Sequence, residues 1–246
     1  MNLLGIAGKA GSGKSTVAKA IQDAFLWTPV AFGDPLKRIC KDVYRFTDDQ
    51  LWGPSESRNA PDKRYVRQRQ GSLGSHLVGW TDDGKRIDAP SPVEDVYLTP
   101  RHALQQLGSE WGRGCFYNTW VQYALDVAEQ LLVKPYPEAP CMGYDPKKGL
   151  FVQDEYPIIR CPGVVFPDVR FGNEIDGIKE KGGKVAIILG RDTSLESEGL
   201  KHDSERDLDP DEFDFVIRNT KDLDHLLEQV GVAMLRLFPE AVRIRR

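Results

Sequence analysis

A glycine-rich segment near the start of the chain has the residue types and spacing that bind phosphate. Residues 8–16 read Gly-Lys-Ala-Gly-Ser-Gly-Lys-Ser-Thr and match the pattern G-x-x-x-x-G-K-[ST]. In that pattern backbone N–H groups and a helix N-terminus surround a phosphate, Lys14 reaches the β- and γ-phosphate oxygens, and the Ser15 hydroxyl ligates Mg²⁺. Glycines are needed because the backbone approaches phosphate closely, in places at positive φ. The residues predicted to bind a nucleoside triphosphate are Gly8, Gly11, Ser12, Gly13, Lys14, Ser15 and Thr16. The alternative is a glycine-rich turn that binds nothing.

A second group of charged residues follows the apolar run 163–168. Asp168 ends that run, Arg170 comes two residues later, and Glu174 falls in the first turn of a helix predicted over residues 172–181. A carboxylate at the end of a strand holds Mg²⁺ in nucleoside-triphosphate enzymes. The alternatives are an ordinary turn aspartate and an acid that the helix dipole favours. We interpret the group as a catalytic site with Lys14, in which Asp168 and Ser15 are the metal ligands.

The helix predicted from Pro100 to about residue 111 offers a third candidate site. Four polar or small residues share one of its faces at about 100° per residue, namely Arg101, Gln105, Gly108 and Ser109. A basic group, an amide and a gap left by glycine suit a phosphate and a flat nucleobase. Leu104, Leu107 and Trp111 lie on an adjacent face that can pack on the core. The alternative is a solvated polar face.

Strands and helices alternate along the chain and position these residues. The apolar runs predict strands over residues 2–7, 29–33, 163–168, 184–189 and 213–217. Helical spacing and caps predict helices over residues 16–25, 34–44, 100–111, 116–133, 172–181 and 221–238, with a hairpin near 145–149. This order predicts an α/β fold of the P-loop NTPase type: a doubly wound parallel sheet with helices on both faces and ligands at the carboxyl ends of the strands.

Three segments interrupt this pattern in what we predict is a single domain, residues 1–246. They are insertions at about 46–99 and 135–163, and a lid at about 191–209. A long segment without periodicity is uncommon in a compact domain unless it moves or binds, and only residues 75–80 of the first insertion indicate a strand. If the bound triphosphate passes its phosphoryl group to a second substrate, the acceptor, we predict that this insertion covers the acceptor site, with one or more of Arg64, Arg67 and Arg69 facing a phosphate. The alternative is a solvated charged loop.

The predicted lid lies between the last two strands, and its closure would exclude water during transfer. Its candidate residues are Arg191, His202, Ser204, Glu205 and Arg206. Of these, Arg191 is predicted to bind ATP, and His202 is equally consistent with a surface loop. Asn219, after the final strand, is placed to meet the donor adenine, although an asparagine there is also a routine helix cap.

The composition argues against several classes of protein. The chain of 246 residues has a formal net charge of −4, with 40% hydrophobic and 28% charged residues. An acidic chain without a clustered basic surface is not typical of nucleic-acid binding. Four scattered cysteines argue against a zinc site and suit a reducing compartment. With no apolar run of eighteen residues and no signal peptide expected, the sequence predicts a cytoplasmic protein without a membrane span.

In combination, these motifs resemble the deoxynucleoside monophosphate kinases of tailed bacteriophages. The resemblance rests on the N-terminal loop, the Arg101-x-x-x-Gln105-x-x-Gly108-Ser109 helix, Trp120, residues 166–174 and residues 202–205, and it covers residues 1–44, 99–134 and 163–235. It implies a P-loop kinase that transfers the γ-phosphoryl group of ATP, with Mg²⁺, to deoxynucleoside monophosphates in deoxynucleotide biosynthesis. It also implies donor binding by Lys14, Ser15 and Thr16. The implied acceptor-pocket residues are Arg101, Gln105, Gly108, Ser109, Trp120 and Arg170, and those of the transfer centre are Asp168, Arg170 and Glu174. One departure is Ser15, where members of the family often carry Asp, which leaves the metal ligands open.

Two other functions remain open at this point. A kinase of another phosphorylated acceptor, such as a phosphomevalonate kinase, shares the loop and a strand-end Asp-x-Arg element. A nucleotide-dependent switch or motor ATPase would act on protein or DNA, but the chain is acidic and has no evident second oligomerisation domain. The predicted partners are therefore ATP and a dNMP, with no stable nucleic-acid or membrane binding. A homodimer is compatible with the sequence, which does not reveal the accepted bases or how deoxyribose is distinguished from ribose.

Overall fold

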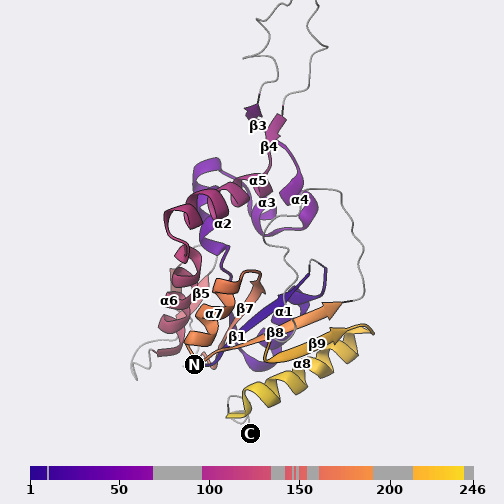
Figure 1. Ribbon diagram of the computed structural model, residues 1–246. Helices are drawn as coiled ribbons and strands as arrows, with labels where there is room; N and C mark the ends of the chain where they lie inside the picture. The colour runs from indigo at the N-terminus through magenta and orange to yellow at the C-terminus, as the bar shows by residue number, and fades with distance from the viewer. Residues whose placement is uncertain are drawn as a thin grey trace, which may run out of the picture. The chain divides into compact units, whose positions relative to one another are not determined.

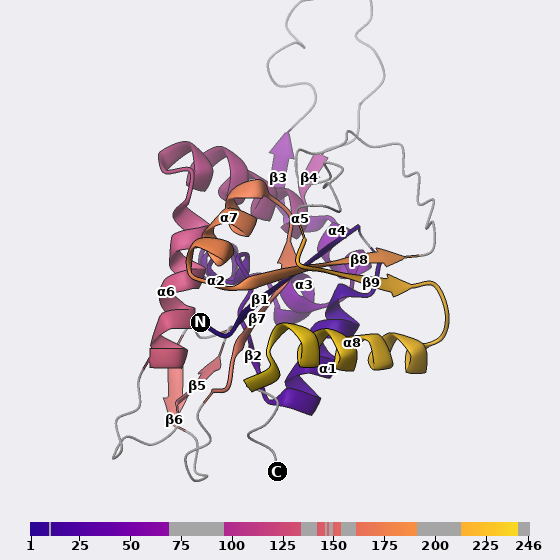
Figure 2. The same cartoon turned by 60° about the horizontal axis from the view of Figure 1, so that its bottom comes forward.

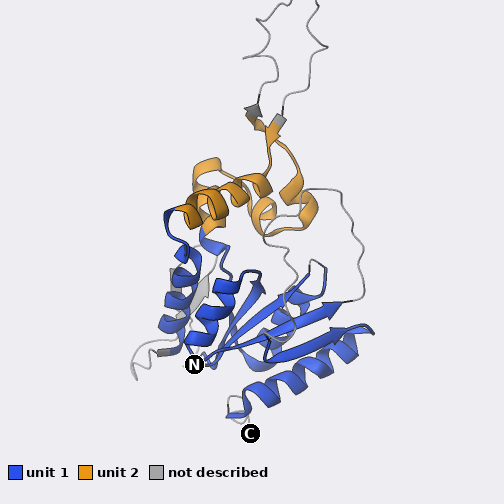
Figure 3. Cartoon of the chain, viewed as in Figure 1, with its two compact units in different colours: residues 1–35, 115–246 blue, residues 36–114 orange. Residues whose placement is uncertain are grey.

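The computed structural model describes residues 1–9, 11–68, 96–133, 142–145, 147, 150–153, 161–190 and 213–240. The chain divides into two compact units, which we describe separately (Figure 3). Unit 1 comprises residues 1–35 and 115–246, and unit 2 comprises residues 36–114. Unit 1 contains the five-stranded sheet, and unit 2 contains short helices and a two-stranded antiparallel ladder.

The sheet of unit 1 is parallel throughout, with the order β2-β7-β1-β8-β9 (Figure 1). Its strands are β1 (Leu3–Gly8), β2 (Thr28–Pro29), β7 (Val164–Val169), β8 (Lys184–Gly190) and β9 (Phe215–Asn219). Crossover connections are required between parallel strands, and the helices α1 (Lys14–Phe25), α6 (Thr119–Val133) and α7 (Gly172–Glu180) lie in them, while α8 (Leu223–Leu237) follows the last strand. The prediction of an α/β fold with a parallel sheet is confirmed, and β5 (Met142–Asp145) with β6 (Leu150–Gln153) forms the predicted hairpin.

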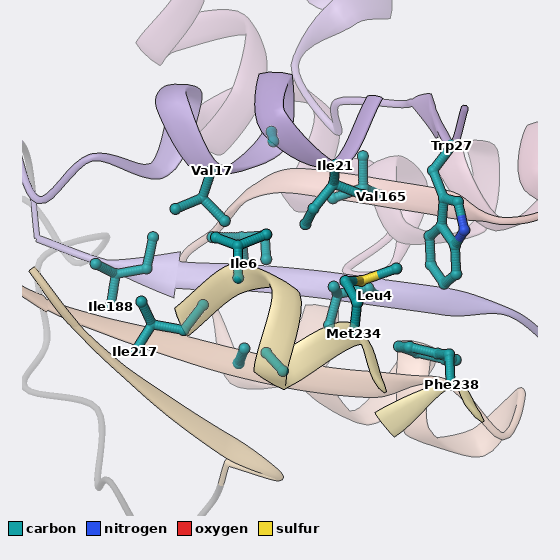
Figure 4. Close-up of a cluster of buried hydrophobic side chains, with 14 of the residues drawn as sticks. Leu4, Ile6, Val17, Ile21, Trp27, Val165, Ile188, Ile217, Met234 and Phe238 are labelled. Carbon is teal, nitrogen blue, oxygen red and sulfur yellow. The ribbon is translucent and has the colours of Figure 1, made fainter. Parts of the chain in front are cut away.

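Helices cover both faces of this sheet, α1 and α8 on one and α6 and α7 on the other (Figure 2). Successive strand residues face opposite sides, so Leu4 and Ile6 of β1 enter the core beneath α1 and α8 (Figure 4). Gly5 faces α7, where a Cβ atom would lie 2.8 Å from Ile178 Cδ1. The buried apolar residues of α1 and α8 in this core include Val17, Ala18, Ile21, Leu226, Val230, Ala233 and Met234. The sheet is thus held between two apolar layers, which fixes its carboxyl edge.

Strand β7 is irregular next to the predicted site. Gly5 of β1 pairs with Phe166, but the next pair is Ala7 with Val169, so Pro167 and Asp168 oppose a single residue of β1. Proline has no N–H to donate to a ladder, and a bulge both accommodates it and redirects a neighbouring side chain. The bulge therefore sets the direction of Asp168.

Unit 2 contains most of α2 (Asp34–Tyr44), followed by α3 (Asp48–Trp52), α4 (Ser55–Asn59), β3 (Asp62–Gln68) and β4 (Val96–Leu98). The helix α5 (Pro100–Gln105) then continues directly into η1 (Gln106–Arg113), a π-helix. The small core of unit 2 consists of Cys40, Phe46, Leu51 and Ala103. Tyr44, Tyr65 and four other partly buried apolar residues pack around it.

Two sequence predictions about elements were wrong. Residues 46–99 were expected to lack regular structure, yet their described part contains α3, α4, β3 and β4. The sequence does contain a signal for the start of α3. Thr47 and Gln50 form a capping box there, with N–H···O distances of 3.2 and 2.9 Å. The strand expected over 29–33 is limited to Thr28–Pro29, because the Ala31 N–H binds the Asp34 carboxylate at 3.2 Å and the chain turns into α2. The predicted strand at 75–80 lies outside the described residues.

None of the described helices is both long enough and apolar enough to cross a membrane.

Candidate nucleotide-binding site

The glycine-rich loop connects the end of β1 to the start of α1 in unit 1. Three of its glycines have positive φ: Gly8 at 145°, Gly11 at 76° and Gly13 at 102°. Residues with a Cβ atom rarely adopt these angles. At Gly8 a Cβ atom would also lie 2.7 Å from Ile188 O. The backbone conformation thus explains why the motif has glycine at these positions.

The loop ends at the exposed N-terminus of α1. The first helical hydrogen bond runs from Val17 N to Gly13 O at 3.0 Å, so the N–H groups of Lys14, Ser15 and Thr16 have no partner within the helix. The first turn contains no acidic residue, and Ser15 and Thr16 are exposed. The positive end of the helix dipole is therefore available to an anion at this point, as the motif predicts.

The Lys14 side chain lies against the glycine-rich loop. Its Nζ donates hydrogen bonds to Gly8 O at 2.6 Å and Lys9 O at 2.9 Å, and lies 3.6 Å from Asp168 Oδ1. The last distance is too long for a hydrogen bond but short enough for attraction between charges. Burial lowers the pKa of Lys14, and the Asp168 carboxylate partly opposes this effect. A cation thus lies between the phosphate-binding loop and the carboxylate that ends β7.

Asp168 and Arg170 form an ion pair beside Lys14. Arg170 Nε and Nη2 lie 2.8 and 2.6 Å from Asp168 Oδ2. The other oxygen, Asp168 Oδ1, is buried and accepts no hydrogen bond. A buried carboxylate oxygen without a donor is costly, and a hydrated cation would satisfy it. The Asp168 carboxylate therefore lies between two cations, Lys14 and Arg170, at the carboxyl edge of the sheet.

This arrangement fits Mg²⁺ bound together with a triphosphate. Mg²⁺ uses one or two protein oxygens and takes its other ligands from phosphates and water. Asp168 Oδ1 and the exposed Ser15 hydroxyl would be the protein ligands. Within the described residues, no group of three or more His, Cys, Asp or Glu side chains could hold a metal ion.

Glu174 lies at the same place and accepts hydrogen bonds from the backbone. It is 3% exposed, and its Oε2 accepts the N–H of Arg170 at 2.7 Å and of Phe171 at 3.2 Å. A buried carboxylate that accepts backbone N–H groups fixes the local chain. The sequence prediction gave Glu174 a role in the transfer centre; the structure shows it holding the segment that carries Arg170.

Asn219 ends β9 at the same edge and contacts the loop. Its Nδ2 donates to Ser12 O at 2.9 Å. The sequence prediction placed this amide against the donor adenine. Arg191 and the rest of the predicted lid, residues 191–209, lie outside the described residues.

The predicted acceptor residues are divided between the units. Arg101 and Gln105 are exposed in unit 2, and Gly108 is buried, with Leu36 Cδ1 3.3 Å from where its Cβ would be. Gly108 and Ser109 belong to the π-helix, whose i→i+5 bonds turn the chain less per residue than the assumed 100°. Sequence periodicity does not reveal a π-helix, so the single face predicted from Arg101 to Ser109 rests on the wrong helical geometry.

Two tryptophans named in the sequence predictions differ in exposure. Trp111, predicted on an apolar face that packs on the core, is 55% exposed. Trp120, predicted to line the acceptor pocket, is the second residue of α6 in unit 1 and is 6% exposed.

A pocket of about 550 Å³ lies within unit 2 on a neighbouring face of α5 and η1. Its lining is mostly apolar and consists of Ile39, Val43, Tyr44, Leu98, His102, Ala103, Gln106, Leu107, Glu110 and Trp111. None of the predicted acceptor residues is in this lining.

The arginines of the predicted cover are only partly described. The Arg64 guanidinium binds the buried Asp62 carboxylate, with Nε and Nη2 at 2.9 and 2.6 Å from its oxygens, and Gln50 Nε2 approaches the same carboxylate at 3.2 Å. The Arg67 side chain and Arg69 lie outside the described residues. The structure thus shows Arg64 bound to Asp62 of its own strand, β3, and to the Arg45 carbonyl oxygen at 3.3 Å.

Fold and loop together define an α/β protein of the P-loop class. No family model matches the chain. A protein of Acanthamoeba polyphaga mimivirus with the printed name "Putative deoxynucleotide monophosphate kinase" is 27% identical over 231 residues, which are 94% of each chain. This similarity supports the prediction of a nucleoside-phosphate kinase.

Solved structures similar to the chain are less informative. They include a dephospho-CoA kinase from Campylobacter jejuni, with 12% identity and a TM-score of 0.40, and TT1252 from Thermus thermophilus, with 16% identity and a TM-score of 0.40. Each comparison covers 96% of this chain and 97% of the other. The P-loop assignment therefore rests on the sheet order, the loop angles and the Lys14–Asp168–Arg170 group.

Proposed function

We propose that this chain is an ATP-dependent kinase that converts deoxynucleoside monophosphates to diphosphates. The observation that carries the proposal is the Lys14–Asp168–Arg170 group beside the P-loop. Support for a nucleotide acceptor comes from the mimivirus relative, whose similarity extends over nearly the whole of both chains. The resemblance to tailed-phage enzymes points to the same acceptor.

In the proposed reaction, an oxygen of the acceptor monophosphate forms a bond to the γ-phosphorus of ATP. The bond between that phosphorus and the β–γ bridging oxygen breaks, and ADP leaves with the electron pair. Such a transfer needs positioning and charge stabilisation more than covalent catalysis. A bound Mg²⁺, held by Asp168 and Ser15, would neutralise charge on the phosphates.

The residues of unit 1 supply the rest of the donor site. The N–H groups at the start of α1 and the Lys14 ammonium bind the donor phosphates, and Arg170 provides a second cation for the transferring group. Glu174 holds the backbone of Arg170 in place. For the acceptor, we propose the residues implied by the resemblance, namely Arg101, Gln105, Gly108, Ser109 and Trp120.

A coupled assay of ADP formation tests this proposal. ATP and Mg²⁺ are supplied with each of the four dNMPs, the four NMPs, phosphomevalonate, DNA or no acceptor. We expect rapid ADP formation only when a nucleoside monophosphate is present. One molecule of the corresponding nucleoside diphosphate should form for each molecule of ADP. Turnover with phosphomevalonate would assign another acceptor, and stimulation by DNA would assign a motor ATPase.

A further inference from the structure

The P-loop packs against the ends of two other strands, β8 and β9. Ser12, at the centre of the loop, is only 4% exposed. Its carbonyl oxygen accepts the Asn219 amide of β9 at 2.9 Å, and a Cβ atom at Gly190 of β8 would lie 3.3 Å from Ser12 Cα. Asn219 and Ser12 are 207 residues apart in sequence. The loop is thus tied to the sheet edge by a contact that the motif itself does not contain.

The Asn219 contact is directional and closely packed. At Gly13, a Cβ atom would lie 2.9 Å from Asn219 Nδ2 and 3.7 Å from Leu226 Cδ2. The amide therefore lies under two consecutive loop residues, Ser12 and Gly13, and its hydrogen bond fixes the peptide that joins them. That peptide's N–H belongs to Gly13, one of the loop groups that point toward a phosphate in this motif.

We infer that Asn219 is a positioning residue for phosphate binding, acting through the P-loop backbone and not by reading the adenine of the donor. This inference rests on the proposed function of the loop as a triphosphate site. N–H groups that are already ordered bind an anion without the entropy cost of becoming ordered on binding. An amide that orients the loop therefore contributes equally to every ligand that has the same phosphates, whatever its base.

The test measures binding of MgATP, MgGTP and inorganic tripolyphosphate with Mg²⁺ to the full chain by calorimetry, with no acceptor present. The variants are Asn219→Ala and Asn219→Leu; the second keeps the same number and branching of side-chain heavy atoms but cannot donate. We expect each variant to weaken all three ligands by a similar factor of about three to ten, the range that follows from one hydrogen bond. The ratio of ATP to GTP affinity should stay within about twofold of wild type.

Gln229→Ala is the matched control. Gln229 binds the backbone of Arg218, the neighbouring residue of β9, through Arg218 N at 2.9 Å and Arg218 O at 2.7 Å. Its loss removes hydrogen bonds from the end of the same strand without touching the loop. We expect this variant to bind the three ligands as wild type does, even if its Tm falls as much as that of Asn219→Ala.

Three results would overturn the inference. The first is a loss of ATP affinity with GTP and tripolyphosphate unchanged, which would place Asn219 at the adenine. The second is unchanged affinity for all ligands in both folded variants. The third is an equal loss in Gln229→Ala, which would show a general effect on the strand. The proposed kinase function is judged separately, by wild-type turnover with nucleoside monophosphates, so either idea can fail alone.

Discussion

In unit 1 an extended apolar core joins four strands to two helices, whereas the described part of unit 2 surrounds a buried cluster of four residues, Cys40, Phe46, Leu51 and Ala103. Unit 2 adds polar contacts to this small core, above all the Asp62–Arg64 pair and the Thr47–Gln50 capping box. A large core can hold strand ends rigidly enough to support a phosphate loop. A small core places more of the stability on individual hydrogen bonds, so the two units should respond differently to substitution.

The largest effect is expected in the donor site of unit 1. Lys14→Ala should reduce kcat about 10²–10³-fold, because an ammonium that stabilises charge on the transferring phosphoryl group is lost. Steady-state kinetics with saturating acceptor measure the effect, and circular dichroism checks the fold. The control is Lys19→Ala on the exposed side of the same helix, whose partner is Asp23 at 3.0 Å. A folded Lys14→Ala enzyme with near wild-type kcat would refute the P-loop assignment.

A selective effect is expected from the proposed acceptor residues. Arg101→Ala should raise KM for the monophosphate about 30-fold, or about 2 kcal/mol, because an ionic hydrogen bond to the acceptor phosphate is removed. KM for ATP should change little. Lys63→Ala, another exposed basic residue of unit 2, is the control and should leave both values unchanged. Equal changes in KM for both substrates would place Arg101 in the transfer centre. No change in either KM would mean that Arg101 lies on a solvated face and contacts no substrate.

Packing in unit 1 should tolerate no added atom between α6 and α7. At Gly177 a Cβ would lie 2.6 Å from Val121 Cγ1, so Gly177→Ala should destabilise the chain by roughly 1–3 kcal/mol. Gly231→Ala in α8 meets no atom within 4 Å and should stabilise by roughly 0.5–1 kcal/mol, because alanine favours a helix. Urea unfolding measures both. The packing account fails if the two substitutions change stability in the same direction.

The smallest effect is expected in unit 2. Hydrogen bonds from Arg64 and Gln50 hold the pKa of Asp62 well below its usual value near 3.8. A lowered pKa means that this stabilisation is complete above the unfolded-state pKa and is lost as pH falls through the folded-state value. Asp62→Asn should therefore cost roughly 1–2 kcal/mol near pH 7 and progressively less in acid. Urea unfolding at pH 7 and pH 3 measures this; a cost that does not shrink at pH 3 would contradict it.

The sequence predicted unit 1 well because its signals are local. The loop pattern, the long apolar runs and the helix caps identify strands and helices without knowledge of their partners. Unit 2 was harder, because helices of five residues such as α3 and α4 are too short to show periodicity, and the π-helix at Gln106–Arg113 has no sequence signature. Partners distant in sequence were beyond prediction as well. Nothing local shows that Asn219 of β9 meets Ser12 of the loop, 207 residues earlier.

The account depends most directly on whether phosphoryl transfer requires a nucleoside monophosphate. ADP formation by wild type and by Lys14→Ala should be measured across the dNMPs and NMPs, with and without each acceptor. The account predicts turnover by wild type that depends on at least one dNMP, produces the matching dNDP, and falls about 10²–10³-fold in Lys14→Ala. ATP hydrolysis at the same rate without any acceptor, or with DNA in place of a nucleotide, would contradict it.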